Sequence, residues 1–200
     1  GPDLLDEARW ELEWMMRMQV PAGQPRAGLV HHKVHDNDWT ALGTLPQLDP
    51  AVPRWLRPVS TAATLNLAAV GAQAARIFAP IDPAFATRCL QSARRAWVAA
   101  EAHPDLVITL DDNHGGGAYE DANLADERFW AAAELYVTTR EAAFRDVMIQ
   151  SPYHFQPRAR AEGGLPQAMD WRNTDALGTI TLAFDAKPST NLLRVYAEIN

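Results

Sequence analysis

The sequence predicts an all-α fold of antiparallel helices joined by long loops. Apolar residues recur at helical spacing in several segments, and clusters of proline and glycine separate these segments. No series of alternating strands is visible, and no motif repeats at a fixed period. A chain of 200 residues is long enough for one layered helical domain with a core of its own.

The first predicted helix covers residues 3–19. Asp3 is a suitable N-cap, and the carboxylates of Asp6 and Glu7 would complement the helix dipole in the first turn. Pro21 and Gly23 then end the helix. The apolar residues at helical spacing are Leu4, Leu5, Ala8, Leu12, Met15 and Met16.

Residues 20–58 are predicted to form a long loop with a short strand at residues 29–34. The segment is rich in proline and glycine, and it contains His31, His32, His35 and Trp39. A loop of this length in a compact domain is usually functional or disordered. Its histidines and aromatic residues favour a functional loop.

Two long helices are predicted next. Ser60 caps a helix that runs through Ile77, and its small residues on nearly every side predict close packing on more than one face. Asp82 caps a second helix that runs to about Ala102. That helix holds Cys89, the single cysteine, so no internal disulfide is possible, and we expect a buried, unreactive thiol.

The remaining chain alternates loops and helices. A loop over 104–125 precedes helices at 126–136 and 141–150, a loop over 151–170, a helix at 174–184 and a short helix from Ser189. The glycine run from Gly115 to Gly117 does not follow a strand, and no Lys-Ser/Thr pair follows it, so it does not indicate a phosphate loop. We expect Asp111 and Asp112 to form a solvated turn, since adjacent side chains point in different directions.

Composition excludes some classes of partner and highlights one residue type. The net charge of −7 argues against a nucleic-acid or anionic-membrane surface, and no apolar run approaches the roughly 20 residues that span a bilayer.

Seven tryptophans are many for this length. Those in helical patterns are expected in the core or between helices: Trp10, Trp14, Trp97 and Trp130. Those in loops or at helix edges are better candidates for stacking on sugars: Trp39, Trp55 and Trp171.

Five motifs together resemble part of the family 9 glycoside hydrolases (cellulases), in that family's order. They are the helix opening at Asp3, the segment from Val30 to Trp39, the helix start at Ser60, the segment from Gly115 to Tyr136, and the helix entry from Trp171 to Thr179. The strongest is Gly-Gly-Gly-Ala-Tyr-Glu-Asp at 115–121 with the helix that follows it. Each motif alone is weak, but five in the right order over residues 3–184 are specific.

This resemblance implies an (α/α)6 barrel, or six-hairpin toroid, that hydrolyses β-1,4-glucans with inversion. It implies that the parent protein is a secreted or periplasmic cellulase that cleaves within the glucan chain. It also implies a substrate groove built from loops at one end of the helices. A full barrel needs twelve helices, so residues 1–200 would be a single segment of the catalytic domain, incomplete at both ends.

Inversion needs an acid and a base whose carboxyls lie roughly 6.5–9.5 Å apart. In the family, paired aspartates N-terminal to the helix that here begins at Asp3 supply the base, and a glutamate far toward the C-terminus supplies the acid. Neither motif is found in this chain. We therefore expect no catalytic residue in it and no activity from this chain alone.

Several residues are candidates for binding sugar. The resemblance places His35 and Trp39 nearest the cleft, and His32 could also contact sugar hydroxyls. Tyr119 and Trp171 are expected to form platforms for β-glucan or cello-oligosaccharide, because flat apolar sugar faces pack on aromatic rings. The alternative for the histidines is a solvated loop or a bond to backbone, and for the two rings it is loop anchoring. A three-histidine metal site is disfavoured, because no cysteine or adjacent carboxylate pattern accompanies it.

Family members often hold calcium near the loop that matches Asp121, Asp126 and Glu127, and Ca²⁺ prefers such oxygen ligands. The alternative is that Asp126 and Glu127 only cap a helix. No organic cofactor is expected.

Two other functions stay open: a noncatalytic helical carbohydrate-binding or scaffold protein, and another α/α-toroid enzyme such as a polysaccharide lyase. We also expect self-association of the isolated chain if unfilled barrel faces expose apolar surface.

Overall fold

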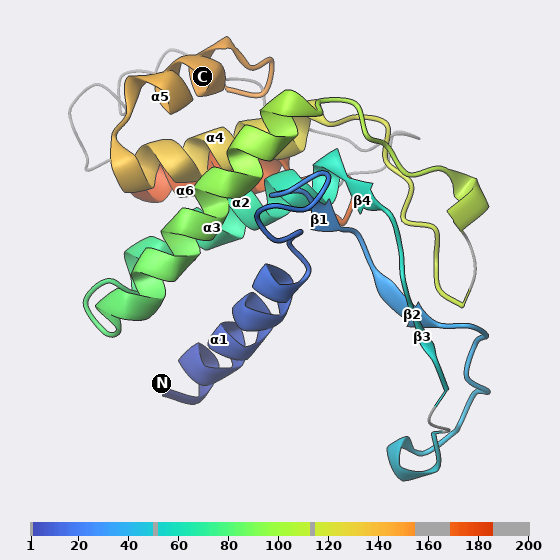
Figure 1. The fold of residues 1–200 in the computed structure, drawn as a ribbon. Helices are drawn as coiled ribbons and strands as arrows, with labels where there is room; N and C mark the ends of the chain where they lie inside the picture. Colours follow the sequence, from blue (N-terminus) through green and yellow to red (C-terminus); the bar gives the residue numbers. More distant parts are fainter. Residues whose placement is uncertain (1, 50–51, 113–114, 155–168, 186–200) are drawn as a thin grey trace, which may run out of the picture.

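The computed structural model describes residues 2–49, 52–112, 115–154 and 169–185, and helices dominate them (Figure 1). The helices are α1 (Pro2–Arg17), α2 (Thr61–Phe78), α3 (Pro83–Ala102), α4 (Ala125–Thr139), α5 (Ala142–Gln150) and α6 (Asp175–Asp185). Short elements between them are β1 (Val30–His31), β2 (Val34–Asp36), η1 (Pro46–Leu48), β3 (Arg54–Leu56), β4 (Val59–Ser60) and η2 (Leu110–Asp112). The predicted helical fold is confirmed, and the helix predicted from Ser189 lies outside the described residues.

Two of the predicted helix starts are confirmed at the level of single hydrogen bonds. The hydroxyl of Ser60 accepts a hydrogen bond from the backbone N–H of Ala63 at 3.1 Å. The carboxylate of Asp82 accepts one from the N–H of Phe85 at 2.9 Å. Each side chain thereby satisfies one of the N–H groups that the first turn of a helix leaves without a partner.

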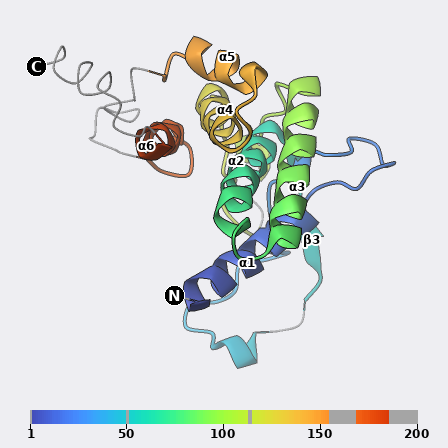
Figure 2. The ribbon, with the colours of Figure 1, turned by 90° about the vertical axis from the view of Figure 1, so that its left-hand side faces the viewer.

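The helices pack in a curved row. Figure 2 shows α3, α2, α4 and α6 side by side, and α5 lies against α4. Because α2 lies between α3 and α4, its small residues are buried on both sides; Ala68, Ala69 and Ala72 have no exposed surface. A Cβ on Gly71 would lie 3.0 Å from the backbone oxygen of Cys89, so glycine favours this close approach of α2 to α3. The prediction of close packing on more than one face is confirmed.

Buried polar groups also join the helices. Glu134 of α4 has no exposed surface and accepts hydrogen bonds from Arg76 of α2 at 2.7 Å and from Thr181 of α6 at 2.6 Å. The thiol of Cys89 is fully buried in α3, and burial raises its pKa to about 11. This confirms the expectation of a buried thiol, and a pKa this high leaves little reactive thiolate at neutral pH.

Two predicted core tryptophans lie at the surface. Trp97 and Trp130 are buried as expected, whereas Trp10 is 61% exposed and Trp14 is 37% exposed, so these two are buried neither in the core nor between the described helices. The reason is that α1 contacts α2 and α3 along one narrow side, where Leu12 packs in the cluster that contains Phe78 and Phe85. No helix in the described ranges is long and apolar enough to cross a membrane.

The segment predicted as a long loop folds into two short antiparallel ribbons. β1 pairs with β4, which fits the strand expected at residues 29–34. β2 pairs with β3, with Val34 opposite Leu56, His35 opposite Trp55 and Asp36 opposite Arg54. Figure 1 shows this second ribbon extending away from the helices, beside the chain that leads from α3 to α4. The second ribbon was not predicted from the sequence.

Candidate functional site

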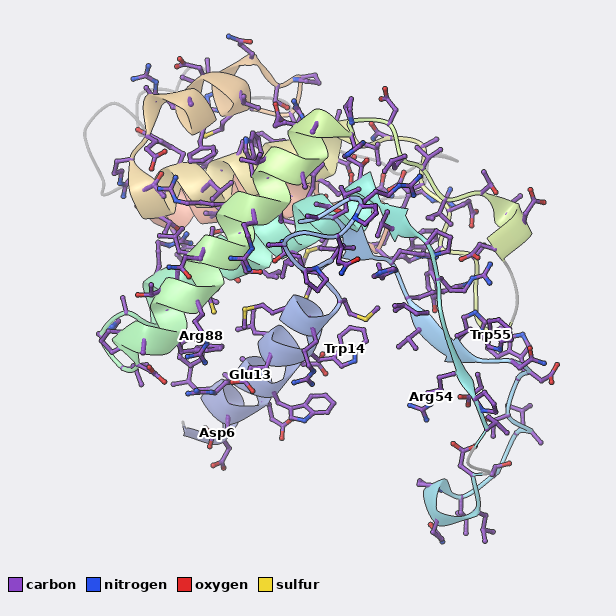
Figure 3. The ribbon with its side chains drawn as sticks, viewed as in Figure 1. Asp6, Glu13, Trp14, Arg54, Trp55 and Arg88 are labelled. Carbon is purple, nitrogen blue, oxygen red and sulfur yellow. The ribbon has the colours of Figure 1, made fainter. Side chains whose placement is uncertain are left out.

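The β2–β3 ribbon carries the first group of candidate side chains. Directly opposite residues of an antiparallel pair point to the same face, so His35 and Trp55 share one face. The next pair points to the other face, where Arg54 Nε donates to Asp36 Oδ1 at 3.1 Å. Figure 3 shows Arg54 and Trp55 on opposite sides of the ribbon.

A pocket of about 250 Å³ lies on the face that bears His35 and Trp55. We call it the ribbon pocket; its lining residues are His35, Asn37, Asp38, Trp55 and Arg57. The indole of Trp55 is half exposed, and His35 Nδ1 donates to the backbone oxygen of Asp36. Trp39, which was expected near the cleft together with His35, is 69% exposed and does not line this pocket.

The glycine run lies between His35 and Tyr119. Gly115 has a φ of +58°, in the left-handed region that favours glycine, and a Cβ on it would lie 2.6 Å from His35 Nδ1. A Cβ on Gly116 would lie 3.6 Å from His35 Cβ, and one on Gly117 would lie 3.2 Å from the Tyr119 ring. Residues without side chains therefore let the backbone pass closely between the histidine and the tyrosine.

Tyr119 and Trp171 form a pair of exposed rings. Their centroids lie 5.5 Å apart with the planes at 89°, and the residues are 55% and 51% exposed. Tyr119 has a φ of +54°, a conformation that costs a non-glycine residue about 1–2 kcal/mol. Arg172 lies 4.7 Å over the Trp171 ring and donates to Glu120 Oε1 at 2.8 Å. Backbone strain of this kind clusters at functional sites, so a strained, exposed ring in a fixed pair favours a binding role.

Asp112 is the centre of a buried group of charges, which we call the Asp112 cluster (His32, Lys33, Arg57 and Asp112). His32 Nε2 donates to Asp112 Oδ2 at 2.5 Å, Arg57 donates to Oδ1, and Lys33 Nζ lies 3.3 Å from Oδ2. Asp112 is only 7% exposed, so the expectation of a solvated turn is wrong for it, although Asp111 is exposed. The two aspartates do point in different directions, and one of those directions is inward.

The charges of this cluster control its titration. Burial acts to raise the pKa of Asp112, but hydrogen bonds from Arg57, His32 and Lys33 outweigh it and hold that pKa below its usual value. Burial lowers the pKa of His32, and the hydrogen bond to Asp112 only partly offsets this. The His32 side chain is 5% exposed, so the predicted substrate contact presents little surface to a ligand in this conformation.

Lys33 connects this cluster to the glycine run. Its ammonium donates to the backbone oxygens of Asp112 at 2.5 Å and of Gly117 at 2.7 Å, and its side chain is 9% exposed. One buried ammonium thus joins the start of the β2–β3 ribbon, η2 and the loop before Tyr119. We call His35, the glycine run, Tyr119 and Trp171 the aromatic strip.

Three carboxylates are buried near the start of α4. Asp121, Asp126 and Glu127 are 7%, 0% and 1% exposed. Asp121 accepts a hydrogen bond from the N–H of Asn123, and Asp126 accepts one from the N–H of Thr174, both at 2.9 Å. Burial, followed by the charges of Asp126 and Asp121, raises the pKa of Glu127 to about 10. Across the described ranges, no three His, Cys, Asp or Glu side chains are arranged as a set that could hold a metal ion.

The structure thus brings together three of the predicted binding residues, His35, Tyr119 and Trp171, and leaves Trp39 apart from the ribbon pocket. Sequence reasoning missed Lys33 and Arg57 as parts of the site. The sequence gives one local indication of their position. Lys33 lies two residues before His35, and Arg57 lies two residues after Trp55, so the members of each pair point to the same face of an extended chain.

Comparisons with known proteins give one consistent result. The family model described as glycosyl hydrolase family 9 matches residues 1–199. Cellulose 1,4-beta-cellobiosidase of Acetivibrio thermocellus is 46% identical over 96% of this chain and 23% of its own length. Endoglucanase C of Cellulomonas fimi is 51% identical over 91% of this chain and 16% of its own length. The chain therefore spans less than a quarter of these curated relatives.

A solved structure agrees with these relatives. The structure of AaCel9A in complex with cellobiose-like isofagomine aligns with a TM-score of 0.76 and 31% identity, covering 90% of this chain and 32% of that chain. The helical row described above therefore recurs, in the same sequence order, within a longer chain.

Proposed function

Because this chain belongs to glycosyl hydrolase family 9, we propose that its aromatic strip forms part of the substrate groove of an inverting endo-β-1,4-glucanase. The chain forms part of a catalytic domain similar to those of endoglucanases and cellulases, and solved structures of that family are (α/α)6 barrels. The observation that carries the proposal is the contact between Tyr119 and Trp171, two half-exposed rings held 5.5 Å apart.

The chemistry of the strip suits a glucan. A β-1,4-linked glucose unit has flat faces of C–H groups that pack on aromatic rings, and its hydroxyls lie around its edge. Tyr119 and Trp171 offer the rings, while Glu120 and Arg172 beside them offer an acceptor and donors for hydroxyls. The glycine run keeps bulky side chains out of the path between Tyr119 and His35.

The acid and base of the reaction are proposed to lie outside these 200 residues. In support, the chain spans 23% and 16% of the two relatives named above. Inversion requires two carboxyls on opposite sides of the scissile bond. This chain would then bind glucan without cleaving it, and the whole protein would supply the proton transfers.

We further propose that Glu127 contributes to a calcium site. Its carboxylate is almost fully buried, and the charges of Asp126 and Asp121 lie close enough to raise its pKa. A cation there would stabilise the ionised carboxylate, so the residue fits a hard divalent ion. Backbone oxygens, which Ca²⁺ also accepts, would complete the coordination, because the described side chains alone do not.

Self-association of the isolated chain is also proposed. The small-residue faces of α2 are covered by α3 and α4, so they do not supply the surface. Exposed apolar residues lie instead on α1 and α6: Trp10, Trp14, Ile180 and Phe184. Sedimentation over a range of concentrations tests this, and a monomer at every concentration would count against it.

The experiment for the main proposal combines binding and turnover on the same protein. Titration with cellohexaose should change the tryptophan fluorescence, whereas maltohexaose, which has α-1,4 bonds and a curved shape, should not. Reducing-sugar release from a soluble cellulose derivative should stay at background. Absence of cellohexaose binding would refute the groove, and cleavage by this chain alone would refute the placement of the acid and base elsewhere.

A further inference from the structure

We infer that the ribbon pocket is an additional sugar subsite, in which Trp55 stacks on a glucosyl unit beyond the one held by Tyr119 and Trp171. This inference rests on the proposed function, since it extends the same binding strip. Its starting observation is the register of the β2–β3 ribbon, which puts Trp55 directly opposite His35 and on the same face.

The pocket has the composition of a sugar site. Trp55 is 51% exposed and offers an apolar platform at one wall. Asn37 and Asp38, both exposed, also line the pocket and are joined by a 3.0 Å hydrogen bond from the amide to the carboxylate. Asn37 retains an acceptor and a donor for hydroxyls, and Asp38 retains acceptors. Arg57 is engaged by Asp112, so the pocket has no free guanidinium that would favour a phosphate or carboxylate ligand.

The volume of the pocket suits one or two glucosyl rings. Sites for drug-sized ligands have about 300–1,000 Å³, and this pocket has about 250 Å³. It is also continuous with the aromatic strip, because His35 lines the pocket and lies against Gly115 and Gly116. Tyr119 follows at the other end of the same glycine run. A glucan long enough to pass the glycines would therefore reach both Trp55 and Tyr119.

The prediction specific to this arrangement is a dependence on chain length. Short cello-oligosaccharides would occupy the Tyr119–Trp171 platform alone, and longer ones would gain affinity from Trp55. Trp55→Ala should therefore reduce the affinity for cellohexaose about ten-fold, which corresponds to about 1.4 kcal/mol of binding free energy. It should leave the affinity for cellotriose unchanged.

The test is calorimetric titration of the protein and its variants with cellotriose and cellohexaose. Trp55→Phe keeps a ring and should recover part of the lost affinity, and Asp38→Asn should weaken cellohexaose binding without affecting the ribbon. Trp10→Ala is the matched control, since it removes another exposed indole, from α1. Circular dichroism confirms that each variant is folded.

The outcomes separate this inference from the proposed function. Binding of both sugars by the wild type with no effect of Trp55→Ala would overturn the subsite and leave the groove intact. An equal loss for cellotriose and cellohexaose would also overturn it, because Trp55 would then not form a separate subsite. Absence of binding by the wild type would overturn both.

Discussion

The ammonium of Lys33 donates a hydrogen bond to the backbone oxygen of Gly117 at 2.7 Å, across 84 residues of sequence. Because the same ammonium also donates to the backbone oxygen of Asp112, it holds the glycine run against the β2–β3 ribbon. The loop that presents Tyr119 is therefore positioned from a distance by one buried charge. This relationship explains how a segment with little secondary structure keeps its rings in place.

Replacing Lys33 should disturb both the fold and the site. Lys33→Met removes the Lys33 donor from the backbone oxygens of Asp112 and Gly117 and takes one of the three cationic or donating side chains from around the Asp112 carboxylate. We therefore expect a loss of about 1–3 kcal/mol of unfolding free energy, measured by urea denaturation. Cellohexaose affinity of the folded variant should also fall. Arg54→Ala is the control, because Arg54 is 66% exposed in its pair with Asp36 and should cost little. A Lys33 variant as stable and as tight-binding as the wild type would contradict the positioning role.

Replacing Tyr119 should weaken cellohexaose binding much more than it lowers the stability of the fold. The φ of Tyr119, +54°, is strained for tyrosine and relaxed for glycine. Tyr119→Gly should therefore change the unfolding free energy by no more than about 1 kcal/mol, because relief of strain offsets the lost ring contact and the greater freedom of the unfolded chain. Cellohexaose affinity should fall at least ten-fold. A variant that lost stability and kept its affinity would show that the tyrosine is a loop anchor.

Glu127 should make the metal-free protein less stable at high pH. The folded pKa of Glu127, about 10, lies above its unfolded value. The stability that the protonated carboxyl contributes to the fold is therefore fully present below about pH 4.5 and declines as the pH rises toward 10. Glu127→Gln removes this titration, and its melting temperature in EDTA at pH 8 should exceed that of the wild type by about 3 °C.

Calcium supplies the matched comparison for Glu127. Added Ca²⁺ should raise the melting temperature of the wild type and not that of Glu127→Gln, whereas Mg²⁺ should have a smaller effect because it demands tighter octahedral geometry. An equal calcium response in both proteins would exclude Glu127 as a ligand.

The Asp112 cluster should make stability depend on mildly acidic pH. The folded pKa of His32 is lowered, so its stabilising contribution is present above the unfolded value near 6.5 and is lost as the pH falls below it. The lowered pKa of Asp112 adds a second loss below about pH 4. His32→Gln keeps a donor for Asp112 without a titrating ring, so its melting temperature should vary less between pH 7 and pH 5. Parallel profiles for the two proteins would contradict this.

Much of the helical fold could be predicted from the sequence, because its signals are local. Ser60 and Asp82 cap the helices that they were expected to cap, and the small residues of α2 predicted its two packed faces. Helical spacing alone could not show which side of α1 is covered, so Trp10 was misplaced. That answer depends on which helices lie beside α1.

The site was predictable only in part, because its geometry depends on pairing between distant segments. The family resemblance indicated His35, residue types indicated Tyr119 and Trp171, and the structure brings the three into one strip. The β2–β3 register and the inward turn of Asp112 have no local signal, so the partners of Trp55 and Lys33 could not be anticipated. Two adjacent aspartates in a polar loop are equally compatible with a solvated turn and with one buried carboxylate.

The most direct test of the central claim is a double-mutant cycle for cellohexaose binding, measured by calorimetry on the wild type, Tyr119→Ala, Trp171→Ala and the double variant. If the two rings form one sugar platform, each single variant should lose at least ten-fold in affinity. The loss of binding free energy in the double variant should then be smaller than the sum of the losses in the two single variants, because the rings contact each other. Single variants that bind cellohexaose as tightly as the wild type would contradict the account.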